Sequence, residues 1–306
     1  MMRARFLPSA ILALSALPAA AQTAPAPGSP AACRLRIDTS ASNWIIRGFD
    51  PFGNSARTAV FDLTFINEGE QDCTFVPVFV LDQEAFGLQS GDGRRTPYSL
   101  SNLYGNYDAT PVAGRTQRRP GQRDVVVAPH GQQVVRVQFE IADESITGDG
   151  LYTQHMQVEA QAADGMAIAG RQLVVGVEVL PSATLGLSGA FRMNNGQASV
   201  NLGELSEGIA QVPLQLRVQS TRRYVLTLES QHHGRLRLDD TDWAVPYQLV
   251  VGGQSVELSG GRGQVRGANA VGARRDSLPL EFRIGDVSDR RAGTYSDVIS
   301  VSIAPE

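Results

Sequence analysis

The sequence contains no lysine, so all 27 basic residues are arginine, and 31 acidic residues outnumber them. The formal net charge at pH 7 is −4. Two of the arginines, Arg3 and Arg5, lie in the first 21 residues, and removal of that segment changes the charge to −4 − 2 = −6. A chain of this charge has no bulk electrostatic attraction to nucleic acid or to an anionic membrane. We therefore expect no nucleic-acid partner.

Residues that carry metal or nucleophilic chemistry are also scarce. The chain has two cysteines and four histidines, with no C-x-x-C pair and no histidine close to either cysteine. His232 and His233 are adjacent and would point to opposite faces of a strand, so a turn is the better interpretation. His130 follows a proline and His155 falls on the outward face of its strand, so neither has an evident serine or cysteine partner. We expect no metal, no cofactor and no catalytic site, and an enzyme ranks last among the functions considered.

Long apolar runs are absent. The longest begins at Phe6 and ends at Leu17, which is too short to span a bilayer. Arg3 and Arg5 precede it and Ala19–Ala21 follow it, the pattern of a secretory signal peptide over residues 1–21. We expect export through the Sec pathway, no transmembrane segment, and a Pro/Ala-rich mature N-terminus over residues 22–32. In the oxidising compartment beyond the membrane, Cys33 and Cys73 are expected to form a disulfide.

Sustained helical periodicity is missing, whereas strand-like alternation recurs along the chain. Alternating apolar positions build sheets with one buried face, so we predict an all-β fold. The clearest examples are Ala59-Phe61-Leu63-Phe65, Val135-Val137-Phe139-Ile141, Val212-Leu214-Leu216-Val218 and Leu278-Leu280-Phe282-Ile284.

The two halves of the chain resemble each other. Phe139-x-Ile141-x-Asp143 and Gly150-x-Tyr152 recur as Phe282-x-Ile284-x-Asp286 and Gly293-x-Tyr295, at one offset of 282 − 139 = 143. Upstream, Pro97-Tyr98 recurs as Pro246-Tyr247, at an offset of 246 − 97 = 149. Two ordered blocks with constant internal spacing predict a duplicated domain.

The duplication is incomplete at its C-terminal end. In the first half, a strand with Met156, Val158 and Ala160 on one face leads into a valine-rich strand from Arg171 to Leu180. In the second half, the matching strand carries Ile299, Val301 and Ile303, and the sequence stops at Glu306. A sandwich without one strand leaves backbone groups unpaired and an apolar groove open. We therefore expect the second domain to accept a strand from another chain.

Three segments of the second half resemble the spore coat protein U domain family: 200–208, 245–249 and the ending 292–303, Ala-Gly-Thr-Tyr-Ser-Asp-Val-Ile-Ser-Val-Ser-Ile. The resemblance implies a subunit of an archaic chaperone–usher pilus, an incomplete immunoglobulin-like sandwich that a chaperone caps and a neighbouring subunit completes. One departure from the pattern is that the second half has no cysteine. Residues 22–30 are Pro-rich and cannot serve as a donor strand, unlike the N-terminal extension of a stalk subunit.

The resemblance thus implies a tip or end subunit, an adhesin. It would comprise an N-terminal adhesin-like β-sandwich over residues 33–181 and a pilin-like β-sandwich over residues 182–306 that lacks its last strand. Ile299, Val301 and Ile303 would line the donor-strand groove. The implied partners are a periplasmic pilus chaperone, an outer-membrane usher, a neighbouring pilus subunit, and a host or abiotic surface. The protein would pass through the periplasm to the cell surface.

Exposed aromatic residues in loops of the first domain are candidate adhesive contacts. Phe49 and Phe52 fall in a turn-rich segment, and Tyr104 and Tyr107 fall in a loop without strand alternation. The alternative for Phe49 and Phe52 is that they fill the end of the sandwich. The alternative for the whole protein is a free secreted or periplasmic binding protein, of carbohydrate for example, whose second domain completes itself.

Overall fold

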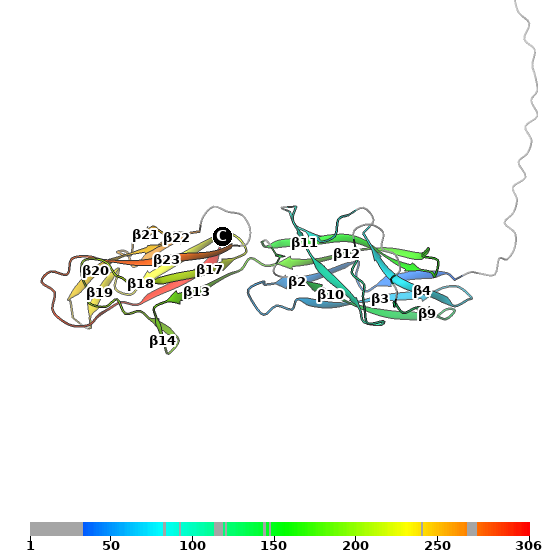
Figure 1. Ribbon diagram of the computed structural model, residues 1–306, viewed down its shortest axis with the longest axis horizontal. Coiled ribbons are helices and arrows are strands. Elements are labelled where there is room, and N and C mark those ends of the chain that lie inside the picture. Colours follow the sequence, from blue (N-terminus) through cyan, green and yellow to red (C-terminus); the bar gives the residue numbers. More distant parts are fainter. Residues whose placement is uncertain are drawn as a thin grey trace, which may run out of the picture.

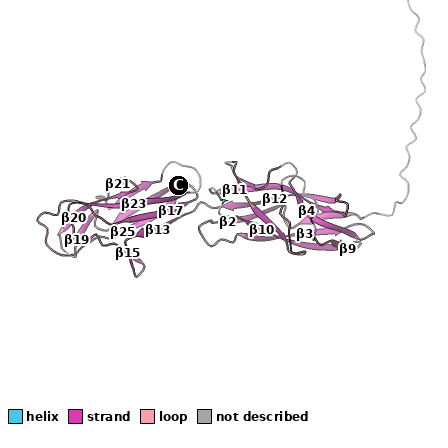
Figure 2. Ribbon diagram, in the orientation of Figure 1, coloured by secondary structure: helices cyan, strands magenta, loops and turns pink. Residues whose placement is uncertain are grey.

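The computed structural model describes residues 33–81, 84–91, 93–112, 119, 121–142, 145–146, 148–239, 241–267 and 274–306. The expected signal peptide (1–21), the Pro/Ala-rich segment (22–32) and Asp143 lie outside the described residues. Within the described part of the chain there is no α-helix, so no helix there could cross a membrane. Strands account for all the regular structure (Figure 2), and the predicted all-β class is confirmed.

Strands β1–β12 form the first of two sandwiches (Figure 1). One sheet has the order β1-β3-β10-β7-β8 and the other β2-β12-β11-β4-β9, to which β5 and β6 are attached. The strands are β1 (Leu35–Thr39), β2 (Asn43–Phe49), β3 (Thr58–Asn67), β4 (Cys73–Val80), β5 (Leu88–Gln89), β6 (Arg95–Thr96), β7 (Tyr98–Asn102), β8 (Tyr107–Asp108), β9 (Val125–Val127), β10 (Gln132–Ile141), β11 (Gly150–Gln161) and β12 (Ala167–Val179).

Strands β13–β25 form the second sandwich. Its larger sheet has the order β13-β17-β23-β20-β19-β24, with β16 on β23 and β21 on β20, and its smaller sheet has the order β22-β18-β25. The strands are β13 (Ala183–Gly189), β14 (Arg192–Asn194), β15 (Gln197–Ser199), β16 (Gly208–Ile209), β17 (Leu214–Ser220), β18 (Tyr224–Ser230), β19 (Arg235–Leu238), β20 (Ala244–Val251), β21 (Gln254–Val256), β22 (Arg262–Arg266), β23 (Arg274–Ile284), β24 (Tyr295–Ser296) and β25 (Ile299–Pro305).

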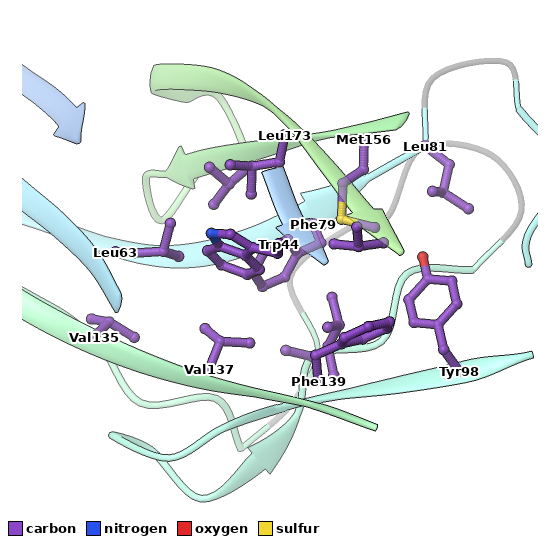
Figure 3. Close-up of a cluster of buried hydrophobic side chains, with 14 of the residues drawn as sticks. Trp44, Leu63, Phe79, Leu81, Tyr98, Val135, Val137, Phe139, Met156 and Leu173 are labelled. Atoms are coloured by element: carbon purple, nitrogen blue, oxygen red, sulfur yellow. The ribbon is translucent and has the colours of Figure 1, made fainter. Parts of the chain in front are cut away.

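The core of the first sandwich is closed and rich in aromatic residues. Trp44 is fully buried and stacks on Phe61 with 5.0 Å between ring centroids, and Phe79 meets it edge-on. Figure 3 shows Trp44 between the side chains of both sheets, with Phe139 and Tyr98 nearby. The alternation that predicted these strands is the alternation of buried and outward positions along β3 and β10.

The predicted disulfide is confirmed. Cys33 and Cys73 are bonded, with their Cα atoms 5.1 Å apart and a sequence separation of 40. The bond joins the chain just before β1 to the first residue of β4, which belongs to the opposite sheet. It therefore fastens the two layers of the first sandwich together.

The strand registers of the two sandwiches are equivalent at the positions of the predicted repeat. Phe139 pairs with Leu100 across β10 and β7, and Phe282 pairs with Leu249 across β23 and β20. These are equivalent positions, because 282 − 139 = 143 and 249 − 100 = 149. The same two offsets relate the β11–β4 register to the β25–β18 register, in which Val301 pairs with Leu228. The two sandwiches thus share their central pairing residue by residue.

A buried polar contact also occurs at equivalent positions of the two sandwiches. The Tyr98 hydroxyl donates to Gln154 Oε1 at 3.2 Å, and the equivalent Tyr247 donates to Asp297 Oδ2 at 2.6 Å. Burial is the main cause that raises the pKa of both tyrosines, with the nearby carboxylates Glu84 and Asp297 adding to it. Both hydroxyls therefore stay protonated and act as donors that tie one sheet to the other.

Candidate functional site: an open sandwich edge and the loops of the first sandwich

The last strand of each repeat has different neighbours. In the first sandwich, β11 pairs with β4 on one side and with β12 on the other, and β12 also runs parallel to β2 and contacts β1. In the second sandwich, β25 pairs with β18 only. Among the described residues, no strand pairs with the other edge of β25, and β13 is the element that lies across from it.

Burial changes at the equivalent positions. Met156, Val158 and Ala160 on β11 are at most 2% exposed, whereas their counterparts Ile299, Val301 and Ile303 on β25 are only half-buried. The same change occurs on β10 and β23. Val135, Val137 and Phe139 on β10 are fully buried, whereas their counterparts Leu278, Leu280 and Phe282 on β23 are half-buried. We call these half-buried residues the apolar strip: Leu185, Leu187, Leu278, Leu280, Phe282, Ile299, Val301 and Ile303.

The apolar strip joins the buried core at the C-terminal end of β23. Ile284 is 4% exposed, like its counterpart Ile141 at 3%, and Tyr247 is also buried. Along β23, the exposure of the inward side chains thus ends at Ile284. The predicted groove residues Ile299, Val301 and Ile303 all lie in this strip, on the inward face of β25.

The predicted adhesive loops occupy different places. Phe49 is 1% exposed, and its carbonyl accepts a 2.8 Å hydrogen bond from the Leu180 amide, so it lies at the end of the first sandwich where the chain leaves for the second. Its ring belongs to the core, which favours the alternative that it fills the sandwich end. Phe52, in the turn that follows, is half-buried. Neither ring is placed at the opposite, outer end.

Tyr104 and Tyr107 also differ from each other. Tyr104 is 41% exposed in the turn between β7 and β8, next to the equally exposed Leu103. The Tyr107 hydroxyl accepts from Asn102 Nδ2 at 2.8 Å, and its ring packs against the valines of β4. Tyr104 is therefore available for an external contact, whereas Tyr107 supports the turn from within.

The outer end of the first sandwich consists of turns that the sequence did not single out. The turns at 68–72 and 128–131 are joined by hydrogen bonds from the Asn67 side chain to Gln71 O and Val127 O, and by His130 Nε2 at 3.1 Å from Glu70 Oε1. Beside them, the turn at 162–166 carries Met166, which is 69% exposed. Met166 lies between Gly165 and Ala167, and no pattern of neighbouring apolar or aromatic residues in the sequence predicts it as a surface contact.

The histidines considered for catalysis lie in turns and on an outward strand face. His232 and His233 lie in a turn, as predicted, and His155 is exposed on β11. No group of three or more histidine, cysteine, aspartate or glutamate side chains within the described ranges is arranged to hold a metal ion. Asp286 accepts from the Ser288 amide at 2.8 Å and so sets a turn.

No family model and no curated protein matches this sequence. Among solved structures, the chain is similar to the CsuC–CsuE chaperone–tip adhesion subunit complex of Acinetobacter baumannii, with a TM-score of 0.44 and 12% identity over 88% of this chain and 100% of that one. It is also similar to the CupB6 tip adhesin from Pseudomonas aeruginosa, with a TM-score of 0.38 and 12% identity over 89% of this chain and 95% of that one. For CfaE, the adhesive subunit of CFA/I fimbria of enterotoxigenic Escherichia coli, the TM-score is 0.33 with 9% identity over 86% and 92%.

All three are described as adhesive subunits or their chaperone complexes, and none as an enzyme. Membership of the spore coat protein U domain family stays a prediction, because no family model matches.

Proposed function

We propose that this protein is a tip or end subunit of a chaperone–usher pilus, which attaches to a surface through the first sandwich and joins the filament through the second. The observation that supports the proposal is the free edge of β25 beside the apolar strip, at the place that β12 fills in the first sandwich. A donated strand would pair with β25 and cover the strip. A periplasmic chaperone would donate the strand first. At an outer-membrane usher, a neighbouring pilus subunit would then replace it.

The deficit in the second sandwich is large enough to require a partner. By analogy with β12, the donated strand buries four apolar side chains, those at the positions of Leu173, Val175, Val177 and Val179. Burial of each stabilises by roughly 1.5–3 kcal/mol. A typical domain is stable by only about 5–15 kcal/mol, so a sandwich without this strand retains little stability.

The test supplies the strand from the protein itself. Glu306 occupies the position of Ala163, because 306 − 143 = 163, so a copy of residues 164–180 appended after Glu306 reproduces the turn and β12. We expect the extended full chain to show a higher unfolding free energy for the second sandwich, by on the order of 5 kcal/mol, in scanning calorimetry. We also expect it to be lost from pili, since its edge is already occupied.

A matched control is the same extension with Val175→Asp and Val177→Asp in the copy, which cannot be buried. It should leave both stability and pilus incorporation as they are in the unextended chain. If the unmodified copy changes neither property, β25 does not accept a strand. If the unextended chain, made without any partner, unfolds cooperatively in both sandwiches, the free binding protein is the better function.

A further inference from the structure

The first sandwich carries a hollow that none of the assembly functions uses. Two overlapping cavities of about 480 Å³ each open on the side of the sandwich along β7 and β8, and they share Phe86, Asp108 and Thr110. Both are shallow and wide open to solvent, so a ligand bound there would stay partly exposed. All the lining residues of the hollow belong to the first sandwich, whereas the apolar strip belongs to the second.

Three of the polar side chains that line the hollow have no hydrogen-bond partner among the described residues. The side chains of Ser99, Ser101 and Asn106 make no hydrogen bond to any described residue. Ser101 pairs with Asp108 in the register of β7 and β8, so its hydroxyl and the carboxylate are cross-strand neighbours. Asn106 precedes β8 with a positive φ of 54°, a conformation that asparagine adopts more readily than most residues. Two hydroxyls, an amide and a carboxylate together offer both donors and acceptors.

An aromatic ring forms one wall of the hollow. Phe86 is half-buried and packs on Tyr98, with 4.8 Å between the ring centroids. Tyr98 in turn is held from inside by its hydrogen bond to Gln154. The phenyl ring is therefore fixed in place, and part of its surface faces solvent beside the polar groups.

The charge of the hollow is balanced. Arg119 Nη1 lies 3.3 Å from Asp108 Oδ2, and Arg119 Nη2 donates to Thr110 O at 2.7 Å. Partial burial opposes the shift, but hydrogen bonds from Thr110 and the charge of Arg119 lower the pKa of Asp108. Asp108 thus stays ionised, and its charge is compensated by Arg119.

We propose that this hollow binds a neutral carbohydrate, whose hydroxyl groups hydrogen-bond to Ser99, Ser101, Asn106 and Asp108 while its apolar ring face packs on Phe86. A sugar is the class of ligand that needs a dense set of donors and acceptors beside one aromatic face. The compensated charge favours an uncharged sugar over an acidic one. The inference deepens the proposed adhesive function of the first sandwich, but it does not depend on the second.

The experiment measures binding of the full chain to immobilised lactose, N-acetyllactosamine, maltose and chitobiose by surface plasmon resonance, with sialyllactose as the acidic comparison. At least one neutral glycan should bind. The double variant Ser99→Ala/Ser101→Ala and the variant Phe86→Ala should each weaken that binding about tenfold. The matched control, Ser188→Ala/Ser277→Ala on β13 and β23, should bind as the wild type does.

Absence of binding to every neutral glycan would overturn the inference, as would binding that both variants leave unchanged or binding to sialyllactose alone. Thermal unfolding of the Phe86 variant shows whether its core is intact, and the serine variants retain their strand. Pilus incorporation is measured on the same variants. Loss of glycan binding with normal pili supports the site, whereas normal glycan binding by a chain that never enters pili counts against the pilus proposal alone.

Discussion

At the scale of single residues, neighbouring positions on one strand have opposite roles. Val301 faces inward on β25 and is half-buried in the apolar strip, whereas Ser302 faces outward and is exposed. The hydroxyl of Ser302 faces water whether or not a strand covers the strip, because successive side chains of a strand point to opposite faces.

We predict that Val301→Asp abolishes pilus incorporation, because a donated strand would have to bury its carboxylate at a cost of several kcal/mol. Ser302→Asp places the same charge one residue away and should incorporate almost normally. Immunoblots of sheared pili give the amounts, and the unfolding transition of the first sandwich should not move in either variant. Equal incorporation of the two variants would show that the strip is not an interface.

At the scale of secondary-structure elements, the disulfide supports only one of the two sandwiches. Cys33 and Cys73 close a loop of 40 residues within the first sandwich. In the loop-entropy account, opening such a loop costs about 4 kcal/mol of stability. In the chain extended by the copy of residues 164–180, whose second sandwich has its own donor strand, Cys33→Ala/Cys73→Ala should therefore lower the unfolding temperature of the first sandwich in calorimetry and leave the second transition in place. A shift of both transitions by the same amount would mean that the sandwiches unfold as one unit.

Much of the strand arrangement was predictable, because it depends on local alternation and on the repeat. The offset of 143 between Phe139 and Phe282 anticipated equivalent pairings, and the structure has them. The strand expected from Val212 begins only at Leu214, since the intervening Pro213 cannot donate a backbone hydrogen bond. The β14–β15 hairpin was not anticipated, although Asn195-Gly196 at its turn, both with positive φ, is a strong hairpin signal.

Other features depend on contacts between distant residues, and no local pattern encodes them. The parallel pairing of β2 with β12 joins residues about 130 positions apart, such as Trp44 and Val175. The hollow is formed by Phe86, which precedes β5, together with residues of β7 and β8. Of its lining residues, the sequence singled out only Tyr107 as a candidate contact. Of the surfaces described above, the apolar residues on β25 were predicted as a groove, whereas the hollow along β7 and β8 and the exposed Met166 were not.

At the scale of the whole molecule, an ion pair links the two sandwiches. Arg222, just before β18, donates from Nε to Asp149 Oδ1 at 2.8 Å, and its Nη2 contacts the other carboxylate oxygen. Around the connection, the Ser182 amide donates to Thr221 Oγ1 at 2.9 Å. The hydrogen bond from Arg222 lowers the pKa of Asp149, although partial burial opposes the effect.

The folded-state pKa of Asp149 lies below its ordinary value of 3.8, so the pair contributes at pH values above about 4 and is lost as the pH falls through the lowered pKa. We predict that small-angle scattering shows a fixed arrangement of the sandwiches at neutral pH and a broader distribution near pH 3. Asp149→Asn should show the broader distribution already at neutral pH, whereas the control Asp164→Asn in the turn at 162–166 should not. Identical scattering from Asp149→Asn and wild type at neutral pH would show that the pair does not hold the junction.

The strand that leaves the first sandwich has a mechanical consequence. A pull on the second sandwich enters the first at Leu180, directly after β12. This strand is bonded along its length to β11 on one side and, from Val174 to Val179, to β2 on the other. Tension directed along β12 loads these two ladders in shear, so many backbone hydrogen bonds must yield together instead of opening one after another. Under flow or drag, the first sandwich would therefore hold its shape to forces that peel apart a terminal hairpin.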